Sequence, residues 1–312
     1  MVNTTPTRDL IGYAGSPPQA EWPGGARVAV NFVINYEEGG ELNVLEGDDR
    51  SEARISDVAV EARIGARGQH IESSYEYGAR VGYWRLLRAF ADRGLTATVN
   101  LVGRAAEMNP LALRAMVDAG MDIQLHGWRW LDFSQLTEAQ EREMIARAVR
   151  QVVDLTGAPP IGYYAGMPSM NTRRLVVEHG GFLYDSDVYN DDLPYWSSDH
   201  PGHLLVPYSL DTNDSRFSRS NGGYQVADEF ATYLRDTFDC LHDEGADRPQ
   251  MMTVGLHARL IGRPGRIVAL HRFLDHIARK GGAWVCRRGD LARHWAAHHP
   301  DPRLRHQKGD TA

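Results

Sequence analysis

Short apolar runs alternate with amphipathic stretches along most of the chain, from residue 28 to residue 298. The apolar runs have the length and side-chain type of buried strands, and the stretches between them repeat apolar positions at helical spacing. The predicted strands cover residues 28–36, 95–100, 121–126, 161–165, 181–185, 204–208, 251–257 and 283–286. The predicted helices cover residues 82–93, 110–118, 138–156, 172–177, 228–242, 265–280 and 290–298.

Two of the predicted helices have clear end signals. Asn109 and Pro110 give one helix a capping side chain and a proline in its first turn. Thr137 and Gln140 form a capping-box pattern at the start of another, and Gly157 is the residue expected just past its end. These signals support the helix bounds given above.

The alternation of strands and helices predicts an α/β fold. The strand runs are apolar on both faces, as expected for parallel strands covered by helices. No change in composition divides the chain, so we expect an N-terminal arm at residues 1–26, one (β/α) barrel at residues 27–300 and a polar tail at residues 301–312. A doubly wound open sheet is the alternative architecture.

Charge and composition exclude several classes of partner. The net charge is −7, and acidic and basic residues are mixed without a Lys/Arg run, so we expect no nucleic-acid partner. The start of the chain lacks an apolar signal-peptide core and no stretch is long enough to span a membrane, so we expect a cytoplasmic protein with no membrane partner. Cys240 and Cys286 fit no zinc or redox spacing, and both are expected to be buried apolar side chains.

Polar side chains that can do chemistry follow several of the predicted strands. In a (β/α) barrel the carboxyl ends of the strands meet at one rim, where catalytic groups lie. Each histidine alone is more simply explained as a hydrogen-bonded core residue, but several such groups at one rim favour a site. The candidates at strand ends are Glu37, Glu38, Asn100, His126, Asp187, His257 and Arg259.

Glu37 and Glu38 stand out because they directly follow the first strand and precede Gly39 and Gly40. Burial of two adjacent carboxylates costs solvation energy and raises the proton affinity of one of them. The glycines permit a sharp turn and a close approach to a ligand. Solvated loop glutamates are the alternative interpretation of this pair.

Three motifs resemble the polysaccharide deacetylase (NodB-homology) superfamily: the acidic pair within residues 35–39, the His-Gly-Trp-Arg-Trp run at 126–130 and Gly-Leu-His at 255–257. More specifically, the chain is similar to the allantoinase branch, which is related to bacterial cyclic imide hydrolases. The resemblance implies a distorted, TIM-like (β/α) barrel and C–N bond hydrolysis. The further stretches that carry it are residues 8–13, 72–78, 171–175, 184–187, 210–214 and 255–264.

The chain departs from the deacetylase metal motif. That motif supplies Asp, His and His, and the matching positions here are Glu38, His126 and Trp130. An indole does not ligate zinc, and catalytic zinc normally has three protein ligands and a water. We therefore expect no metal and no other cofactor, as the allantoinase-like branch also implies. Recruitment of Asp187 or His257 as a replacement ligand is the alternative.

A second departure is Met167, at a position where the resemblance implies an arginine. A cation there would pair with a ureide or carboxylate of the substrate, whereas a thioether offers soft apolar surface. Met167 therefore indicates a less polar ring, such as a cyclic imide, hydantoin or lactam. A packing role with unchanged specificity is the alternative.

The resemblance also implies catalytic roles. Glu37 matches the catalytic base, although it would titrate as a coupled pair with Glu38, and His257 matches the general acid. His126 is expected to orient water or polarise the carbonyl.

A further group of residues is expected to bind substrate, beginning with Trp130 as a wall of the pocket. Arg259 would stabilise an oxyanion or anchor a second carbonyl, unless it forms an ion pair across the rim. Asp187, with its neighbour Asp185, is expected to support His126. The remaining members of this group are Asn100 and Met167.

We therefore predict a hydrolase that opens a small cyclic amide, namely an allantoin-like ureide, a hydantoin or a cyclic imide, without a metal. One alternative is a zinc-dependent polysaccharide or peptidoglycan deacetylase. Another is a barrel that binds a small ligand without catalysis. The only partner expected from the residues is the small-molecule substrate, and the resemblance suggests a homotetramer.

Overall fold

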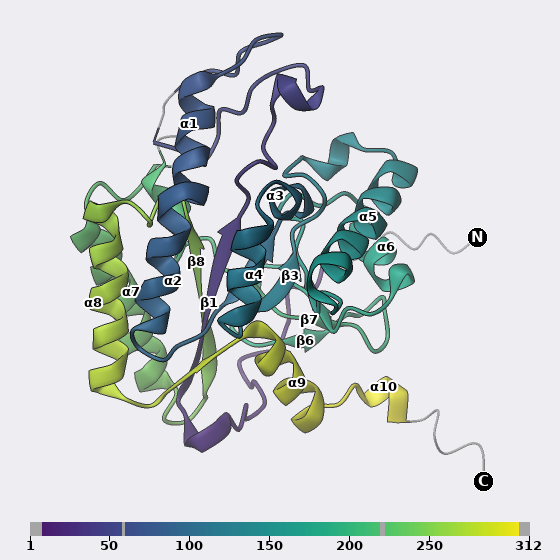
Figure 1. Ribbon diagram of the computed structural model, residues 1–312. Helices are drawn as coiled ribbons and strands as arrows, with labels where there is room; N and C mark the ends of the chain where they lie inside the picture. The colour runs from purple at the N-terminus through teal and green to yellow at the C-terminus, as the bar shows by residue number, and fades with distance from the viewer. Residues whose placement is uncertain (1–7, 58–59, 219–221, 306–312) are drawn as a thin grey trace.

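The structure is a computed structural model that describes residues 8–57, 60–218 and 222–305 (Figure 1). The expected N-terminal arm and C-terminal tail thus lie partly outside the described residues, at 1–7 and 306–312.

The described strands form a single nine-stranded sheet. Its order is β6-β7-β5-β4-β3-β2-β1-β8, and β9 also pairs with β1. All neighbouring strands are parallel except β6 and β7. The strands are β1 Val28–Tyr36, β2 Thr98–Leu101, β3 Asp122–Leu125, β4 Gly162–Tyr163, β5 Tyr184–Asp185, β6 Tyr195–Trp196, β7 Leu204–Leu205, β8 Gln250–His257 and β9 Ala283–Cys286.

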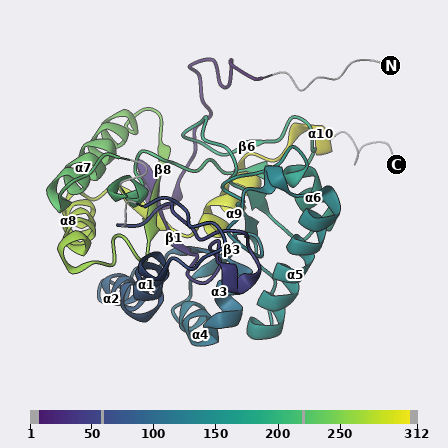
Figure 2. The ribbon, with the colours of Figure 1, turned by 90° about the horizontal axis from the view of Figure 1, so that it is seen from above.

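Helices cover the outside of this curled sheet, and the view from above shows them arranged around the strands (Figure 2). The expected α/β fold, a distorted barrel, is therefore confirmed as a curled half-barrel. The helices are α1 Gln69–Tyr77, α2 Tyr83–Ala91, α3 Gly103–Met108, α4 Pro110–Asp118, α5 Glu138–Thr156, α6 Thr172–His179, α7 Ala227–Glu244, α8 Pro264–Lys280, α9 Arg288–His298 and α10 Pro302–Arg305.

The first strand is the centre of the fold. Every residue of β1 is buried, because strands flank it on both sides and helices cover it. In the register of the sheet, Asn35 lies opposite Asn100 on β2 and His257 on β8. The ends of three strands therefore meet beside the residues that follow β1.

The predicted helix signals are confirmed. The side chain of Asn109 accepts a hydrogen bond from the backbone N–H of Ala112 at the start of α4. Thr137 and Gln140 form a complete capping box at the start of α5, and Gly157 ends that helix in the left-handed conformation.

The helical stretch that precedes β2 begins earlier than predicted. It starts at Gln69 rather than Gly82 and contains one π-helical segment, Gly78–Gly82. A Cβ on Gly82 would lie 2.0 Å from the carbonyl oxygen of Ala258, so this glycine lets the helix pack directly on the loop after β8. Glycines that usually weaken a helix are here required by packing, which explains why the helical pattern was missed. The short elements α3, β6 and α10 were also not predicted.

The N-terminal arm is packed against the barrel. The ring of Trp22 is buried and lies 5.8 Å from the ring of Trp284 and 5.9 Å from that of Trp295. None of the described helices is long and apolar enough to cross a membrane.

The prediction that both cysteines are buried is wrong for one of them. Cys286 is buried at the end of β9, but Cys240 is exposed on α7. Its Sγ lies 3.6 Å from a carboxylate oxygen of Glu244, one helical turn further on. Helix α7 presents Cys240 on its outer face, which its sequence position alone does not reveal.

Candidate active site

A buried carboxylate lies between two histidines at the carboxyl ends of the strands. Glu37 follows β1, His126 follows β3 and His257 ends β8. Glu37 Oε1 lies 3.2 Å from His126 Nε2 and 3.7 Å from His257 Nε2. Three of the four predicted catalytic side chains are thus brought together, and all of them are buried.

Arg259 completes the surroundings of this carboxylate. Its Nη2 donates to Glu37 Oε2 at 2.7 Å, and its Nε donates to the carbonyl oxygen of Ile55 at 2.7 Å. Burial acts to raise the pKa of Glu37, but Arg259 and then the two histidines outweigh it and hold that pKa well below the usual value. Glu37 is therefore an ionised carboxylate at neutral pH.

Glu38 has a different environment although it is the next residue. Its Oε2 accepts the backbone N–H of Glu37 at 3.0 Å, and its Oε1 lies 3.6 Å from Arg259 Nη1. Burial raises the pKa of Glu38. Arg259 opposes this increase, and the charge of Glu37 adds to it. A Cβ on Gly78 would lie 2.2 Å from Glu38 Oε1, so the π-helical segment leaves room for this side chain. The pKa values of the two adjacent carboxyl groups are therefore shifted in opposite directions.

The carboxylate of Asp214, which follows β7 in the chain, holds His257 in place. Asp214 Oδ1 lies 2.6 Å from His257 Nδ1, so this ring nitrogen donates to it. Asp214 Oδ2 accepts the backbone N–H groups of His257 and Ile261. The imidazole is thereby oriented with Nε2 toward Glu37.

His126 is oriented by a backbone carbonyl. Its Nδ1 donates to the carbonyl oxygen of Tyr164 at 2.8 Å, and its ring stacks on the Tyr164 ring at 5.1 Å. The expected support from Asp185 or Asp187 takes another form. Asp187 accepts the backbone N–H groups of Ala165 and Gly166, both at 2.8 Å, so it holds the loop beside the histidine.

Glu37, His126 and His257 open into a pocket of about 240 Å³. Its wall also contains aromatic rings, two side-chain amides and the guanidinium of Arg54. The other residues that line it are Asn35, Arg54, Ile55, Trp130, Tyr164, Gly166, Met167, Tyr189, Tyr208, Leu210, Asn213 and Ser215.

The predicted substrate-binding residues divide into two groups. Trp130 and Met167 line the pocket. Asn100 does not line the pocket but donates to Asn35 Oδ1 at 2.8 Å, and Asp187 does not line it either but accepts the backbone N–H of Ala165. Arg259 is fully buried and forms ion pairs, as the alternative interpretation of this residue expected.

The zinc that the deacetylases use does not fit these residues. Trp130 lines the pocket with an indole, which is no metal ligand. Across residues 8–57, 60–218 and 222–305, no group of three or more His, Cys, Asp or Glu side chains is arranged to hold a metal ion.

Several residues of the site were not predicted. Asp214 was not among the predicted site residues, and nothing in its local sequence shows that it faces His257. Tyr208 was also missed. Its hydroxyl oxygen accepts from Asn35 at 3.0 Å and from Asn213 at 3.2 Å, which leaves its own proton for a bound ligand.

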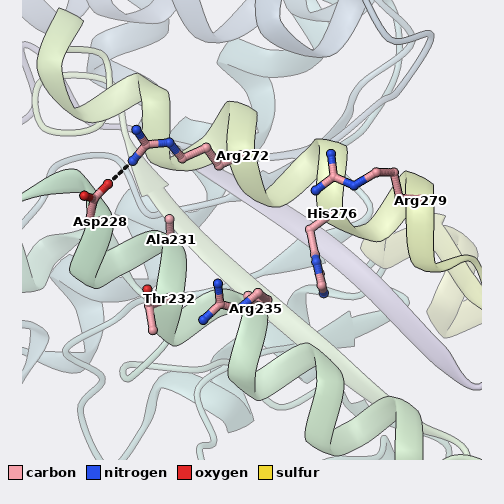
Figure 3. Close-up of a pocket in the computed structure, with 7 residues that line it drawn as sticks. All are labelled: Asp228, Ala231, Thr232, Arg235, Arg272, His276 and Arg279. Carbon is pink, nitrogen blue, oxygen red and sulfur yellow. Dashed lines mark hydrogen bonds and ion pairs between the residues drawn. The ribbon is translucent and has the colours of Figure 1, made fainter.

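Another hollow, of about 460 Å³, lies between the outer faces of α7 and α8 (Figure 3). The one carboxylate that lines it, Asp228, is already paired with Arg272. The other lining residues are Ala231, Thr232, Arg235, His276 and Arg279. This hollow lacks the buried carboxylate–histidine arrangement of the first pocket, which is therefore the better candidate for an active site.

Comparison with known proteins identifies the family of this chain. Residues 64–179 match the family model described as polysaccharide deacetylase. A Schizosaccharomyces pombe protein whose name places it among the polysaccharide deacetylases is 39% identical, over 94% of this chain and 98% of its own.

Two solved structures are similar over nearly the whole chain. The crystal structure of PuuE allantoinase is 50% identical with a TM-score of 0.92, over 94% of this chain and 98% of that one. A Pseudomonas aeruginosa PAO1 structure that bears the polysaccharide deacetylase name is 51% identical with a TM-score of 0.91, over 94% and 99% of the two chains.

Proposed function

The chain belongs to the polysaccharide deacetylase family of hydrolases, and we propose that it opens a small cyclic amide by C–N bond hydrolysis. The candidate substrates are an allantoin-like ureide, a hydantoin or a cyclic imide. The 50% identity to PuuE allantoinase supports this substrate class.

The observation that carries the proposal is the ionised Glu37 between two oriented histidines in a pocket of about 240 Å³. Pockets that hold drug-sized ligands are roughly 300–1,000 Å³. The smaller volume suits a single ring with a few substituents better than a sugar chain.

Hydrolysis needs an activated water, a stabilised oxyanion and a proton for the departing nitrogen. In the proposed mechanism Glu37 accepts a proton from water, and the water oxygen bonds to the ring carbonyl carbon. His126, in its doubly protonated form with Nδ1 donating to Tyr164, donates a hydrogen bond from Nε2 to the carbonyl oxygen, which carries the developing negative charge. The C–N bond then breaks as His257 donates its Nε2 proton to nitrogen, which yields a carboxylic acid and a free N–H group. The acid loses its proton to solvent, and the proton held by Glu37 passes to His257, which restores the starting state of both residues.

The geometry supports this division of roles between the two glutamates. Glu37 lines the pocket and is held ionised, whereas Glu38 lies behind it and retains its proton to higher pH. A base must be deprotonated and within reach of water, and of the two only Glu37 meets both conditions. Asp214 would stabilise the protonated form of His257 from which nitrogen receives its proton.

A cyclic imide or ureide has a strained or activated carbonyl compared with a simple acetamide. We infer that His126 and Glu37 suffice for such a carbonyl without a Lewis acid. The mechanism therefore contains no metal-dependent step, in agreement with the donor set around Trp130.

The test is a hydrolysis screen of chelator-treated protein against allantoin, hydantoin, succinimide, glutarimide and dihydrouracil, with identification of the ring-opened product. We expect turnover of at least one ring after exhaustive chelation. Activity that disappears with chelator and returns with zinc would contradict the metal-independent mechanism.

The second candidate function is deacetylation of an N-acetyl sugar. It is favoured by the names of the Schizosaccharomyces pombe relative and of the Pseudomonas aeruginosa structure. The same screen with N-acetylglucosamine oligomers separates the two functions. Turnover of these oligomers without turnover of any ring would replace the first proposal with the second.

A further inference from the structure

A partly exposed arginine reaches into the candidate active site from a loop that Arg259 and Tyr75 hold in place. Arg54 and Ile55 both line the pocket. The carbonyl oxygen of Ile55 accepts from Arg259 Nε at 2.7 Å, and that of Arg54 accepts from the hydroxyl of Tyr75 at 3.3 Å. Because Arg259 also binds Glu37, one guanidinium fixes both the catalytic carboxylate and this loop.

The backbone of the loop adopts a conformation that its sequence does not favour. Ile55 has a φ angle of 47°, in the left-handed region where a β-branched residue is an outlier. Such strain persists only where surrounding contacts impose it, and it concentrates at ligand-binding positions. Here it directs the side chains of Arg54 and Ile55 to the pocket.

One edge of the Arg54 guanidinium is already occupied. Its Nε and Nη2 donate to the carboxylate of Glu52 at 3.1 and 3.4 Å. Glu52 is itself buried and also accepts the backbone N–H groups of Ala53 and Arg54. The cation is therefore anchored by a carboxylate that does not line this pocket.

The other edge of the guanidinium lacks an oxygen partner among the described residues. Nη1 lies 2.8 Å from Met167 Sδ, and a thioether is only a weak acceptor. The cation also lies 4.5 Å from the centre of the Trp130 ring, which holds its plane over one wall of the pocket. An arginine side chain that is 40% exposed, anchored on one edge and open on the other, is pre-organised to receive oxygen atoms.

We propose that Arg54 is a specificity-determining residue that binds a carboxylate or ureido oxygen carried outside the ring of the substrate. This inference rests on the proposed function and narrows its substrate class. Met167 makes the adjacent wall of the pocket apolar, but Arg54 places a positive charge beside it. The presence of Met167 therefore does not by itself favour a less polar ring. The preferred ring bears an oxygen-rich substituent.

The test compares rings with and without such a substituent. The matched probes are hydantoin, hydantoin-5-acetic acid, which adds a carboxylate, and allantoin, which adds a ureido group. The variants are Arg54→Met, which removes the charge at similar volume, and Arg54→Lys, which keeps the charge without the planar fork. Arg50→Met removes an exposed arginine outside the pocket and is the control.

We expect Arg54→Met to lower kcat/KM by roughly 10- to 100-fold for a substituted ring and by less than threefold for hydantoin. Arg54→Lys should give an intermediate loss. The two substituted rings identify the group that Arg54 binds. A larger loss of kcat/KM with hydantoin-5-acetic acid indicates a carboxylate, and a larger loss with allantoin indicates a ureido group. Equal losses on all three rings, or no loss, would overturn the role of Arg54.

Binding measured by calorimetry separates this inference from the proposed function. If the parent protein turns over none of the rings, the proposed function fails. The Arg54 inference still stands if a substituted ring binds the parent protein at least tenfold more tightly than it binds Arg54→Met. Equal affinity for the two proteins, or no binding of any ring, would overturn it.

Discussion

His257 and Asp214 form a 2.6 Å hydrogen bond, with Nδ1 of the imidazole donating to Oδ1 of the carboxylate. The partners are 43 residues apart in sequence, and both are buried. The second oxygen of Asp214 accepts the backbone N–H of His257, so one carboxylate fixes both the ring and the backbone of this residue. This is the arrangement that a proton donor needs, because it orients the ring and stabilises its charged form.

Replacement of this carboxylate should impair the proton donor. In Asp214→Asn the amide donates to Nδ1, so the neutral ring carries its proton on Nε2 and the charged form loses its partner. We expect kcat to fall on the order of 10²- to 10⁴-fold, measured with the best ring from the screen. Asp211→Asn, at an exposed position in the same loop, is the matched control. A change in kcat of less than twofold in Asp214→Asn would contradict the proposed role.

The two adjacent glutamates should respond differently to the same substitution. Glu37→Gln removes the ionised carboxylate that accepts the proton, so turnover should become undetectable while the fold persists. Glu38→Gln replaces a carboxyl group that does not line the pocket, so we expect a loss below about tenfold. Circular dichroism and steady-state rates are the measurements. Normal turnover in Glu37→Gln would move the base to another residue.

Arg259 should control the acid limb of the pH–rate profile. Burial alone would raise the pKa of Glu37, and the nearby guanidinium is the largest influence that lowers it. Without that cation the folded pKa of Glu37 rises, so the rise of kcat/KM with pH should occur at higher pH in Arg259→Gln. Arg259→Lys keeps the charge and should show a smaller displacement.

The same substitution also carries a cost in stability. Removing one partner of a buried ion pair typically costs about 3–5 kcal/mol, so the profiles should be recorded well below the midpoint of thermal unfolding. An acid limb at the same pH in the parent protein and both variants would show that Arg259 does not set the protonation of the base.

Much of the fold was predictable because its strands and helices repeat simple patterns. The nine buried residues of β1 are mostly apolar, and the signals at Asn109 and Thr137 marked helix starts correctly. The helical stretch before β2 was predicted to begin too far along the chain. Gly78 and Gly82, which are unusual within a helix, are needed because their Cα atoms pack closely against Glu38 and Ala258. Such contacts are long-range, and no local pattern encodes them.

The candidate site was predictable where strand ends determine it. Glu37, His126 and His257 follow or end strands that lie in one sheet, so their proximity follows from the order of the strands. Asp214 and Arg54 lie outside strands, and their positions depend on how two loops fold over the barrel. Arg259 was expected at the rim, but only its contacts show that it holds Glu37 and Ile55 instead of facing the pocket.

Glu41 should make the stability of the protein depend on pH. This carboxyl group is buried beside the site, and its Oε2 accepts the backbone N–H of Gly39 at 2.6 Å. Burial raises its pKa to about 7, from a usual value of 4.5. Since the folded state binds this proton more tightly, the stabilising contribution is complete below pH 4.5 and is lost as pH rises through 7.

Glu41→Gln keeps the hydrogen-bond acceptor but has no proton to lose. Its free energy of unfolding, relative to that of the parent protein, should therefore increase between pH 4.5 and pH 8, by up to about 3 kcal/mol for a difference of this size in pKa. Urea unfolding at several pH values measures the change, and Glu61→Gln, at an exposed position, is the matched control. A difference between Glu41→Gln and the parent protein that stays constant with pH would mean that Glu41 is already ionised in the folded state, with Arg259 compensating for its burial.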